Sequence, residues 1–113
     1  MPSGPWRKMR ICFTLKVRSD KVEEYKEHHA RVWPEMLNAL RETGWHNYSL
    51  FLRADGLLIG YVETDDFERC CREMKEHPVN AQWQAAMAPF FEAMNDGGAD
   101  DNMFPIEEVF HLD

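Results

Sequence analysis

The sequence has 113 residues, a length typical of one domain, and a formal net charge of −7. Hydrophobic residues make up 44% of it and aromatic residues 12%, which favours a packed core and argues against a disordered chain. The negative charge argues against nucleic acid or an anionic membrane as a partner, and no apolar run is long enough to span a bilayer. We therefore expect a single domain over residues 1–113 that binds neither nucleic acid nor membrane.

The cysteines and the start of the chain indicate where the protein resides. The sequence has three cysteines, Cys12, Cys70 and Cys71, and an odd number does not suit a disulfide framework. Two of them are adjacent, which does not suit a zinc site. No signal-peptide pattern opens the chain. These features predict free thiols in a cytoplasmic protein, with residues 1–8 as a flexible leader.

The first part of the chain has the pattern of a strand followed by a helix. Residues 9–17 alternate apolar and polar side chains, which is typical of a half-buried strand. Over residues 21–43, apolar side chains recur at spacings of three and four, the pattern of a helix that buries one face. Ser19 or Asp20 is the expected N-cap of this helix, and Gly44 is expected to end it.

Pro34 lies inside this helical pattern. It has no N–H for the carbonyl of Ala30, and its ring crowds that carbonyl. We therefore expect the helix to kink or restart near residues 31–33, directly after two adjacent histidines.

Two further strands are predicted in the middle of the chain. Residues 45–52 and 57–64 are rich in aromatic and aliphatic side chains. Asp55-Gly56 between them is a strong hairpin signal, so the two strands should be antiparallel neighbours.

The last part of the chain has the pattern of two helices, a loop and a strand. Residues 65–77 predict one helix, and residues 80–94 predict another with Asn80 as its N-cap. The Gly, Asp and Asn content of residues 95–105 predicts a loop. Residues 106–112 predict a final strand.

These elements follow the order β-α-β-β-α-β, with the second helix in two pieces. This is the ferredoxin-like pattern, an α+β sandwich in which helices cover one face of an antiparallel sheet. The predicted strands are too apolar for the other face to remain in water. We therefore expect a homodimer that packs sheet against sheet.

The adjacent histidines His28 and His29 are not equivalent on a helix. His29 shares the inward stripe with Tyr25, whereas His28 points about 100° away and should lie among the solvated charges. An inward histidine is either a hydrogen-bonded core residue or a functional group. The tyrosine one turn earlier and the proline that follows both favour the functional interpretation of His29.

Two other elements offer side chains near His29. The second predicted strand presents Tyr48 and either His46 or Asn47, which is more polarity than a core needs. The late helix carries Trp83, which is either a core residue or a platform on which a sugar ring stacks.

The sequence has no pattern typical of a metal or cofactor site. His28 and His29 cannot both point at one ion from a regular helix, and no His-x-x-x-His run occurs. No glycine-rich phosphate loop or Gly-x-Ser-x-Gly run occurs either, and Cys12 has no evident base beside it. The other histidines, His46, His77 and His111, lie on separate predicted elements, so only their convergence in the fold would form a metal site, and the sequence offers no support for it.

The chain resembles the L-rhamnose mutarotase family in four separated motifs. They are "EEYKEHHARVWPEM", "HNYSLFL", "HPVNAQWQAAM" and "EEVFHL", and the resemblance covers about residues 9–112. It implies a dimeric ferredoxin-like α/β-barrel fold and a cofactor-free isomerase that interconverts the α and β pyranose anomers of L-rhamnose. It also implies His29 as the proton donor and Tyr25, Tyr48 and Trp83 as sugar-binding residues.

The chain departs from the family at Gln84, where the family has the second tryptophan of a Trp-Trp pair. Gln84 removes apolar stacking surface and adds hydrogen-bonding groups, so we expect it to bind substrate in a more polar pocket. The loop over residues 95–105 also differs from the Asn-Pro-rich family form and is a candidate pocket wall. The expected substrate is therefore L-rhamnose or a related monosaccharide.

Mutarotation requires a proton at the ring oxygen and the loss of one from the anomeric hydroxyl. A histidine, with an unperturbed pKa of about 6.5, exchanges protons near neutral pH, which suits His29 to acid/base catalysis.

Two alternative functions would use the same fold. One is another dimeric ferredoxin-like barrel enzyme, such as a small oxygenase or a lactone isomerase, with a flatter and more apolar substrate. The other is a non-catalytic sugar-binding dimer, which would bind a sugar without anomer exchange.

Overall fold

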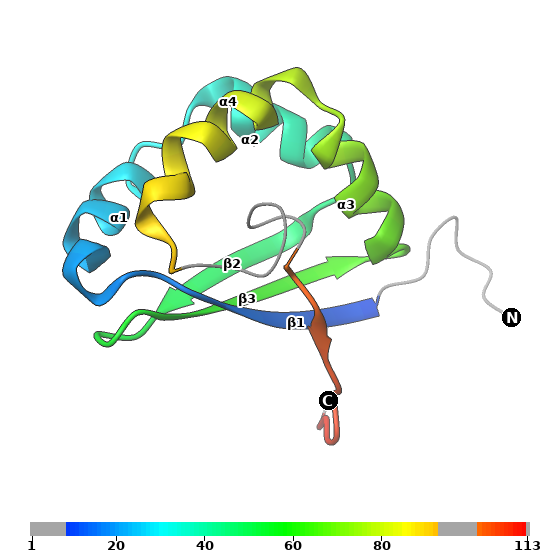
Figure 1. Cartoon of the computed structure of the whole chain (residues 1–113). Helices are drawn as coiled ribbons and strands as arrows, with labels where there is room; N and C mark the ends of the chain where they lie inside the picture. The colour runs from blue at the N-terminus through cyan, green and yellow to red at the C-terminus, as the bar shows by residue number, and fades with distance from the viewer. Residues whose placement is uncertain (1–8, 93–101, 113) are drawn as a thin grey trace, which may run out of the picture.

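An antiparallel sheet forms the base of the fold in the computed structural model, which describes residues 9–92 and 102–112 (Figure 1). Its four strands in this range are β1 (Met9–Lys16), β2 (His46–Leu52), β3 (Leu57–Thr64) and β4 (Pro105–Ile106). Their order across the sheet is β2-β3-β1-β4, and β1 pairs with β3 along its whole length. The predicted leader, residues 1–8, and residues 95–101 of the predicted loop lie outside the described residues.

Helices cover one face of this sheet (Figure 1). They are α1 (Val22–His29), α2 (Pro34–Glu42), α3 (Phe67–Lys75) and α4 (Pro78–Met87). The core lies between the two layers, and its most deeply buried side chains include Phe13, Val17, Leu58, Val62 and Met87. This element order confirms the predicted ferredoxin-like α+β fold. None of the helices in the described ranges is long and apolar enough to cross a membrane.

The long helix predicted before β2 is broken at the predicted place. α1 ends at His29, and α2 begins with Pro34 as its first residue, where the missing N–H costs no helical hydrogen bond. Gly44 follows α2 with a φ of 93°, the left-handed conformation that ends many helices. The predicted N-cap is wrong, because Ser19 and Asp20 lie in a 3-10 turn and neither side chain caps α1.

The start of α4 also differs from the prediction. The helix begins at Pro78, because proline favours the first helical position and His77 accepts a backbone N–H of the first turn. Asn80 is therefore not the cap but a residue inside the helix. α4 ends at Met87, earlier than predicted. The 3-10 turn Ala88–Phe90 that follows contains a proline, which cannot donate the next helical hydrogen bond.

The predicted hairpin joins β2 to β3. Gly56 has a φ of 102°, and a Cβ at this position would lie 2.1 Å from the carbonyl oxygen of Val17, so the turn requires glycine. The carboxylate of Asp55 pairs with Arg53 and accepts the backbone N–H of Leu57. The hairpin prediction is confirmed.

The predicted final strand over residues 106–112 is mostly wrong. β4 has only two residues, and they lie opposite Cys12 and Phe13 at the edge of β1. Residues 107–112 continue past the sheet on the side away from the helices (Figure 1) and are exposed. An alternating sequence needs a neighbouring strand to complete its hydrogen bonds, and the described chain places none beside this segment.

Candidate active site

A cavity of about 340 Å³ lies between the helices and the sheet. This volume is in the range of pockets that hold a small molecule. Its wall includes all five residues predicted for the site: Tyr25, His29, Tyr48, Trp83 and Gln84. The structure thus brings together, in one cavity, side chains from α1, β2 and α4.

His29 is the last residue of α1, one helical turn after Tyr25. The two rings stack with their centroids 4.1 Å apart. His29 Nδ1 lies 3.1 Å from the carbonyl oxygen of Tyr25, and because a carbonyl oxygen only accepts, Nδ1 carries the hydrogen. Nε2 is therefore the ring nitrogen that remains to exchange a proton with a ligand.

The surroundings of His29 lower its pKa. Burial is the largest influence, because the charged imidazolium loses water. The hydrogen bond to the Tyr25 carbonyl raises the pKa of His29, and the charge of neighbouring His28 lowers it. The net result is a pKa of His29 below its ordinary value, so the protonated ring is a stronger acid than free imidazolium.

His28 is not part of this cavity. Its side chain is exposed, and its ring packs against Phe90 with the centroids 5.1 Å apart. The different surroundings of His28 and His29 agree with the helical geometry that separated them in the sequence.

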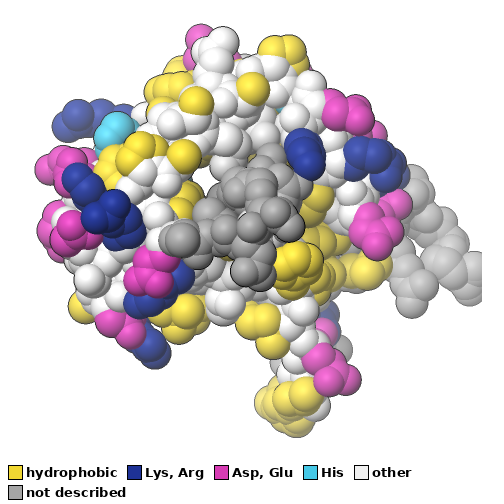
Figure 2. Space-filling view, viewed as in Figure 1, with side chains coloured by type: hydrophobic (Ala, Val, Ile, Leu, Met, Phe, Trp, Pro, Cys, Tyr) yellow, Lys and Arg dark blue, Asp and Glu magenta, His cyan; other side chains and the backbone are white. Residues whose placement is uncertain are grey.

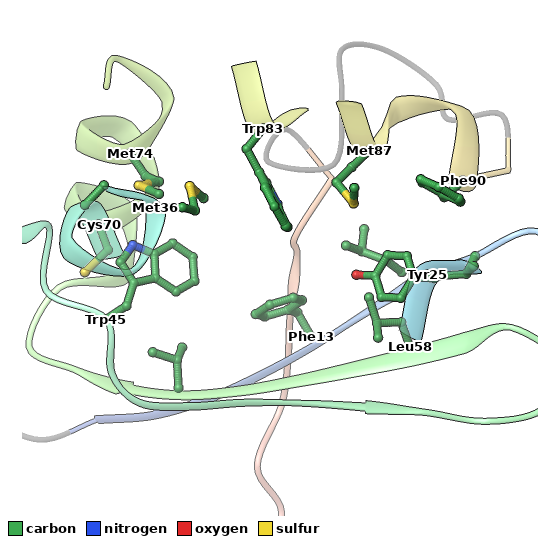
Figure 3. Close-up of a cluster of buried hydrophobic side chains, with 14 of the residues drawn as sticks. Phe13, Tyr25, Met36, Trp45, Leu58, Cys70, Met74, Trp83, Met87 and Phe90 are labelled. Carbon is green, nitrogen blue, oxygen red and sulfur yellow. The ribbon is translucent and has the colours of Figure 1, made fainter. Parts of the chain in front are cut away.

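Trp83 joins the core to the cavity. Its ring meets the rings of His29 and Trp33 nearly at right angles, with centroids 5.4 Å and 5.0 Å away. The side chain is 6% exposed and belongs to the core cluster, yet it also lines the cavity. Figure 3 shows Trp83 reaching from α4 into the space between the two layers. This residue is therefore a member of the core that also offers an aromatic surface to a ligand.

A β-bulge in β2 decides which of its side chains reach the cavity. The pairing of β2 with β3 shifts by one residue between His46 and Ser49, and Asn47 within the shift has a φ of 49°. His46 and Asn47 are both exposed, whereas Tyr48 turns inward, with its ring centroid 4.9 Å from that of Trp45. The prediction that His46 or Asn47 joins Tyr48 at the site is therefore wrong.

The hydroxyl groups of Tyr25 and Tyr48 stay protonated at neutral pH. Burial raises the pKa of Tyr25 and that of Tyr48 well above the usual value, because a phenolate would lose its water. In Figure 3 the Tyr25 hydroxyl is directed toward the middle of the layer between sheet and helices. Both hydroxyls are therefore available as hydrogen-bond donors to a ligand oxygen.

Gln84 brings an amide to the cavity wall, and Asn80 holds it. Gln84 Nε2 donates to Asn80 Oδ1 over 3.2 Å, and the two residues lie one turn apart on α4. Asn80 is 2% exposed and lines the same cavity. Sequence reasoning missed Asn80 as a site residue because it assigned Asn80 to the helix cap. The signal that could have found it is the four-residue spacing to Gln84.

Other predicted features can also be placed. Met103, which belongs to the loop predicted as a pocket wall, lines the cavity. Cys12, Cys70 and Cys71 are free thiols, and Cys71 also lines the cavity. Within residues 9–92 and 102–112, no group of three or more His, Cys, Asp or Glu side chains is arranged to hold a metal ion.

The chain has close relatives among known proteins. The sequence profile of the L-rhamnose mutarotase family matches residues 10–112. An L-rhamnose mutarotase from Bacillus subtilis (strain 168) is 40% identical over 108 residues, which cover 95% of this chain and 98% of the relative.

Two solved structures share the fold. An L-rhamnose mutarotase from Formosa agariphila has a TM-score of 0.74 and 23% identity, covering 93% of this chain and 99% of that one. Tetracenomycin F2 cyclase from Streptomyces glaucescens has a TM-score of 0.64 and 18% identity, covering 92% of this chain and 98% of that one. At these identities the likeness concerns the fold alone, since one fold carries many activities. The sequence matches over nearly the whole length are decisive: the chain belongs to the L-rhamnose mutarotase family of isomerases.

Proposed function

We propose that this protein interconverts the α and β pyranose anomers of L-rhamnose or a closely related monosaccharide, with His29 as the acid and base. The reaction and the sugar come from the names of the relatives. The observation that carries the proposal is the cavity, in which the Tyr25 carbonyl engages Nδ1 of His29 and leaves Nε2 for a proton transfer. This arrangement does not need a metal or a cofactor, in line with the family resemblance.

The reaction opens the sugar ring and closes it on the other face of an aldehyde. In the forward direction, protonated His29 delivers a proton from Nε2 to the ring oxygen as the bond between that oxygen and the anomeric carbon breaks. The anomeric hydroxyl gives its proton to water and becomes the carbonyl. After rotation about the C1–C2 bond, the former ring oxygen attacks the carbonyl carbon. Its proton returns to the neutral His29, and water restores the proton of the anomeric hydroxyl.

The remaining site residues hold the sugar during this rotation. The hydroxyls of Tyr25 and Tyr48 donate hydrogen bonds to sugar oxygens, and Trp83 packs against the apolar face of the ring. General acid/base help of this kind accelerates a reaction on the order of 10²–10⁴-fold. That is enough for mutarotation, which already proceeds slowly in water.

Saturation-transfer NMR measures anomer exchange directly and tests the role of His29. We expect His29→Gln to lower the catalysed exchange rate of L-rhamnose by about 10²–10⁴-fold, because the proton transfer is lost. His28→Gln is the matched control, since His28 lies outside the cavity and its charge is the smallest of the influences on the pKa of His29, so we expect a rate within a few-fold of the wild type. An unchanged rate in His29→Gln would contradict the assignment. A wild-type protein that binds L-rhamnose without accelerating exchange would instead be a sugar-binding protein.

The proposal includes a homodimer in the cytoplasm. Large apolar side chains are exposed on the outer face of β2 and along the C-terminal segment, namely Phe51, Phe104, Ile106, Val109, Phe110 and Leu112. Figure 2 shows hydrophobic side chains gathered at the end of this segment, away from the body of the molecule. Exposed apolar surface of this extent marks an interface, and a second copy that packs here would cover it. The cytoplasm would keep the three free thiols reduced.

A further inference from the structure

Two side-chain amides form one hydrogen-bonded unit in the cavity wall. Asn80 and Gln84 lie one turn apart on α4, and Gln84 Nε2 donates to Asn80 Oδ1 over 3.2 Å. Asn80 is 2% exposed, whereas Gln84 is half-buried with its side chain on the wall of the cavity. The hydrogen bond to a buried partner fixes the orientation of the Gln84 amide plane.

This orientation presents the carbonyl oxygen of Gln84 as an acceptor. Nε2 and Oε1 occupy opposite arms of the amide, so the oxygen points away from Asn80 when the nitrogen donates to it. In the part of the chain that the structure describes, the side chain of Gln84 bonds to Asn80 alone. Its oxygen and its second N–H therefore remain for a ligand.

The polarity of this pair contrasts with its surroundings. The same cavity is lined largely by apolar side chains, among them Met36, Leu40 and Met87. A ligand methyl group placed against Gln84 would remove water from the amide and return no hydrogen bond, whereas a ligand hydroxyl would both donate and accept. Leaving one such polar group unpaired corresponds to a loss of about 5- to 150-fold in binding.

We propose that Asn80 and Gln84 form a hydroxyl-binding subsite that favours a hexose with a hydroxymethyl group over its 6-deoxy counterpart. This inference rests on the proposed anomer exchange. The methyl group is the one wholly apolar substituent of a 6-deoxypyranose, so it is the group that an amide disfavours most. Gln84 contacts the sugar, and Asn80 is a positioning residue. The sugar that tests the choice is L-mannose, which differs from L-rhamnose by this one hydroxyl.

The test compares kcat/KM for anomer exchange of L-mannose with that of L-rhamnose in the wild type and three variants. Gln84→Met keeps the length of the side chain without the amide, and we expect the L-mannose to L-rhamnose ratio to fall by about 5- to 150-fold. Asn80→Leu releases Gln84 and should lower the ratio in the same direction. Gln82→Met changes an exposed glutamine of α4 that does not line the cavity, and we expect no change.

The possible outcomes separate this inference from the proposed function. An unchanged ratio in Gln84→Met, with both sugars still exchanged, would overturn the subsite and leave the mutarotase assignment standing. A wild type that accelerates anomer exchange of neither sugar would overturn the mutarotase assignment. In that case an NMR titration tests the subsite by itself, and equal affinities for L-mannose and L-rhamnose would overturn it as well. Should Asn80→Leu fail to fold, Asn80→Asp retains an acceptor for Gln84 Nε2 and is expected to keep the wild-type ratio.

Discussion

Asn47 lies within the bulge of β2 and has its left-handed backbone conformation. Its φ of 49° lies in the left-handed region, which asparagine and glycine accept and which costs a β-branched residue about 1–2 kcal/mol. Its side-chain Nδ2 also donates to Glu63 Oε2 over 3.1 Å on the exposed side of the strand. Asn47→Gly loses this hydrogen bond and makes the unfolded chain more flexible, which costs about 0.4–1 kcal/mol. Asn47→Val loses the same bond and strains the folded backbone instead. The difference in stability between the two variants is therefore the backbone strain less the entropic cost of glycine, up to about 1.6 kcal/mol.

For a domain of this length, each kcal/mol shifts the melting temperature by about 4 °C. We therefore expect Asn47→Val to melt below Asn47→Gly, by up to about 6 °C, in thermal unfolding followed by circular dichroism. A second readout is anomer exchange at a temperature well below both melting points. If valine pulls residue 47 toward regular strand geometry, Tyr48 turns away from Trp45 and the cavity, so exchange should fall more in Asn47→Val than in Asn47→Gly.

Two results would refute this reasoning. An Asn47→Val variant that melts above Asn47→Gly would show that residue 47 is not strained by a β-branched side chain in this conformation. A lower melting temperature with equal exchange rates in the folded proteins would show that the bulge stabilises the sheet without positioning Tyr48.

Two further predictions concern stability and assembly. The folded protein lowers the pKa of His29, so below about pH 6.5 the unfolded chain binds more protons than the folded one. The contribution of neutral, buried His29 to the free energy of unfolding is therefore fully present above about pH 6.5. It is lost as the pH falls through the lower pKa of the folded state. Urea unfolding over a pH series should show this loss in the wild type and a flatter profile in His29→Gln; equal slopes would contradict the burial of His29. Sedimentation should give twice the chain mass for the wild type and a smaller mass for Phe110→Asp, which places a charge on the exposed C-terminal segment. A monomeric wild type would contradict the proposed homodimer.

Local patterns in the sequence were sufficient to predict most of the fold. The alternation in β1, the Asp55-Gly56 turn and the break at Pro34 each depend on residues that are neighbours in the chain. Helical spacing likewise separated His29 from His28 without tertiary information. The five predicted site residues come from three separate motifs, and the structure places all of them around one cavity.

The features that the sequence did not predict depend on contacts between distant segments. The bulge at Asn47 appears only when β2 is aligned with β3, because the shift is a property of the pair. Asparagine is a common helix cap, so the sequence around Asn80 predicted a cap there. Its role in the cavity wall depends on side chains from other helices and from the sheet, which the local sequence does not show. The alternating residues after Ile106 predicted a strand, but hydrogen bonds to a neighbouring strand decide whether such a segment joins a sheet.

The break at Pro34 has an electrostatic consequence for the proposed acid. Because the first helix ends at His29, the imidazole lies at the carboxyl end of α1, where backbone dipoles add to a partial negative charge. This partial negative charge stabilises the imidazolium of His29 and so offsets part of the cost of burying it. The Tyr25 carbonyl, which accepts the hydrogen bond from Nδ1, is one of the groups that carry this charge. A continuous helix through residue 34 would move that negative end several residues away. Pro34, which does not line the cavity, would thereby help to tune the acid strength of the proposed proton donor.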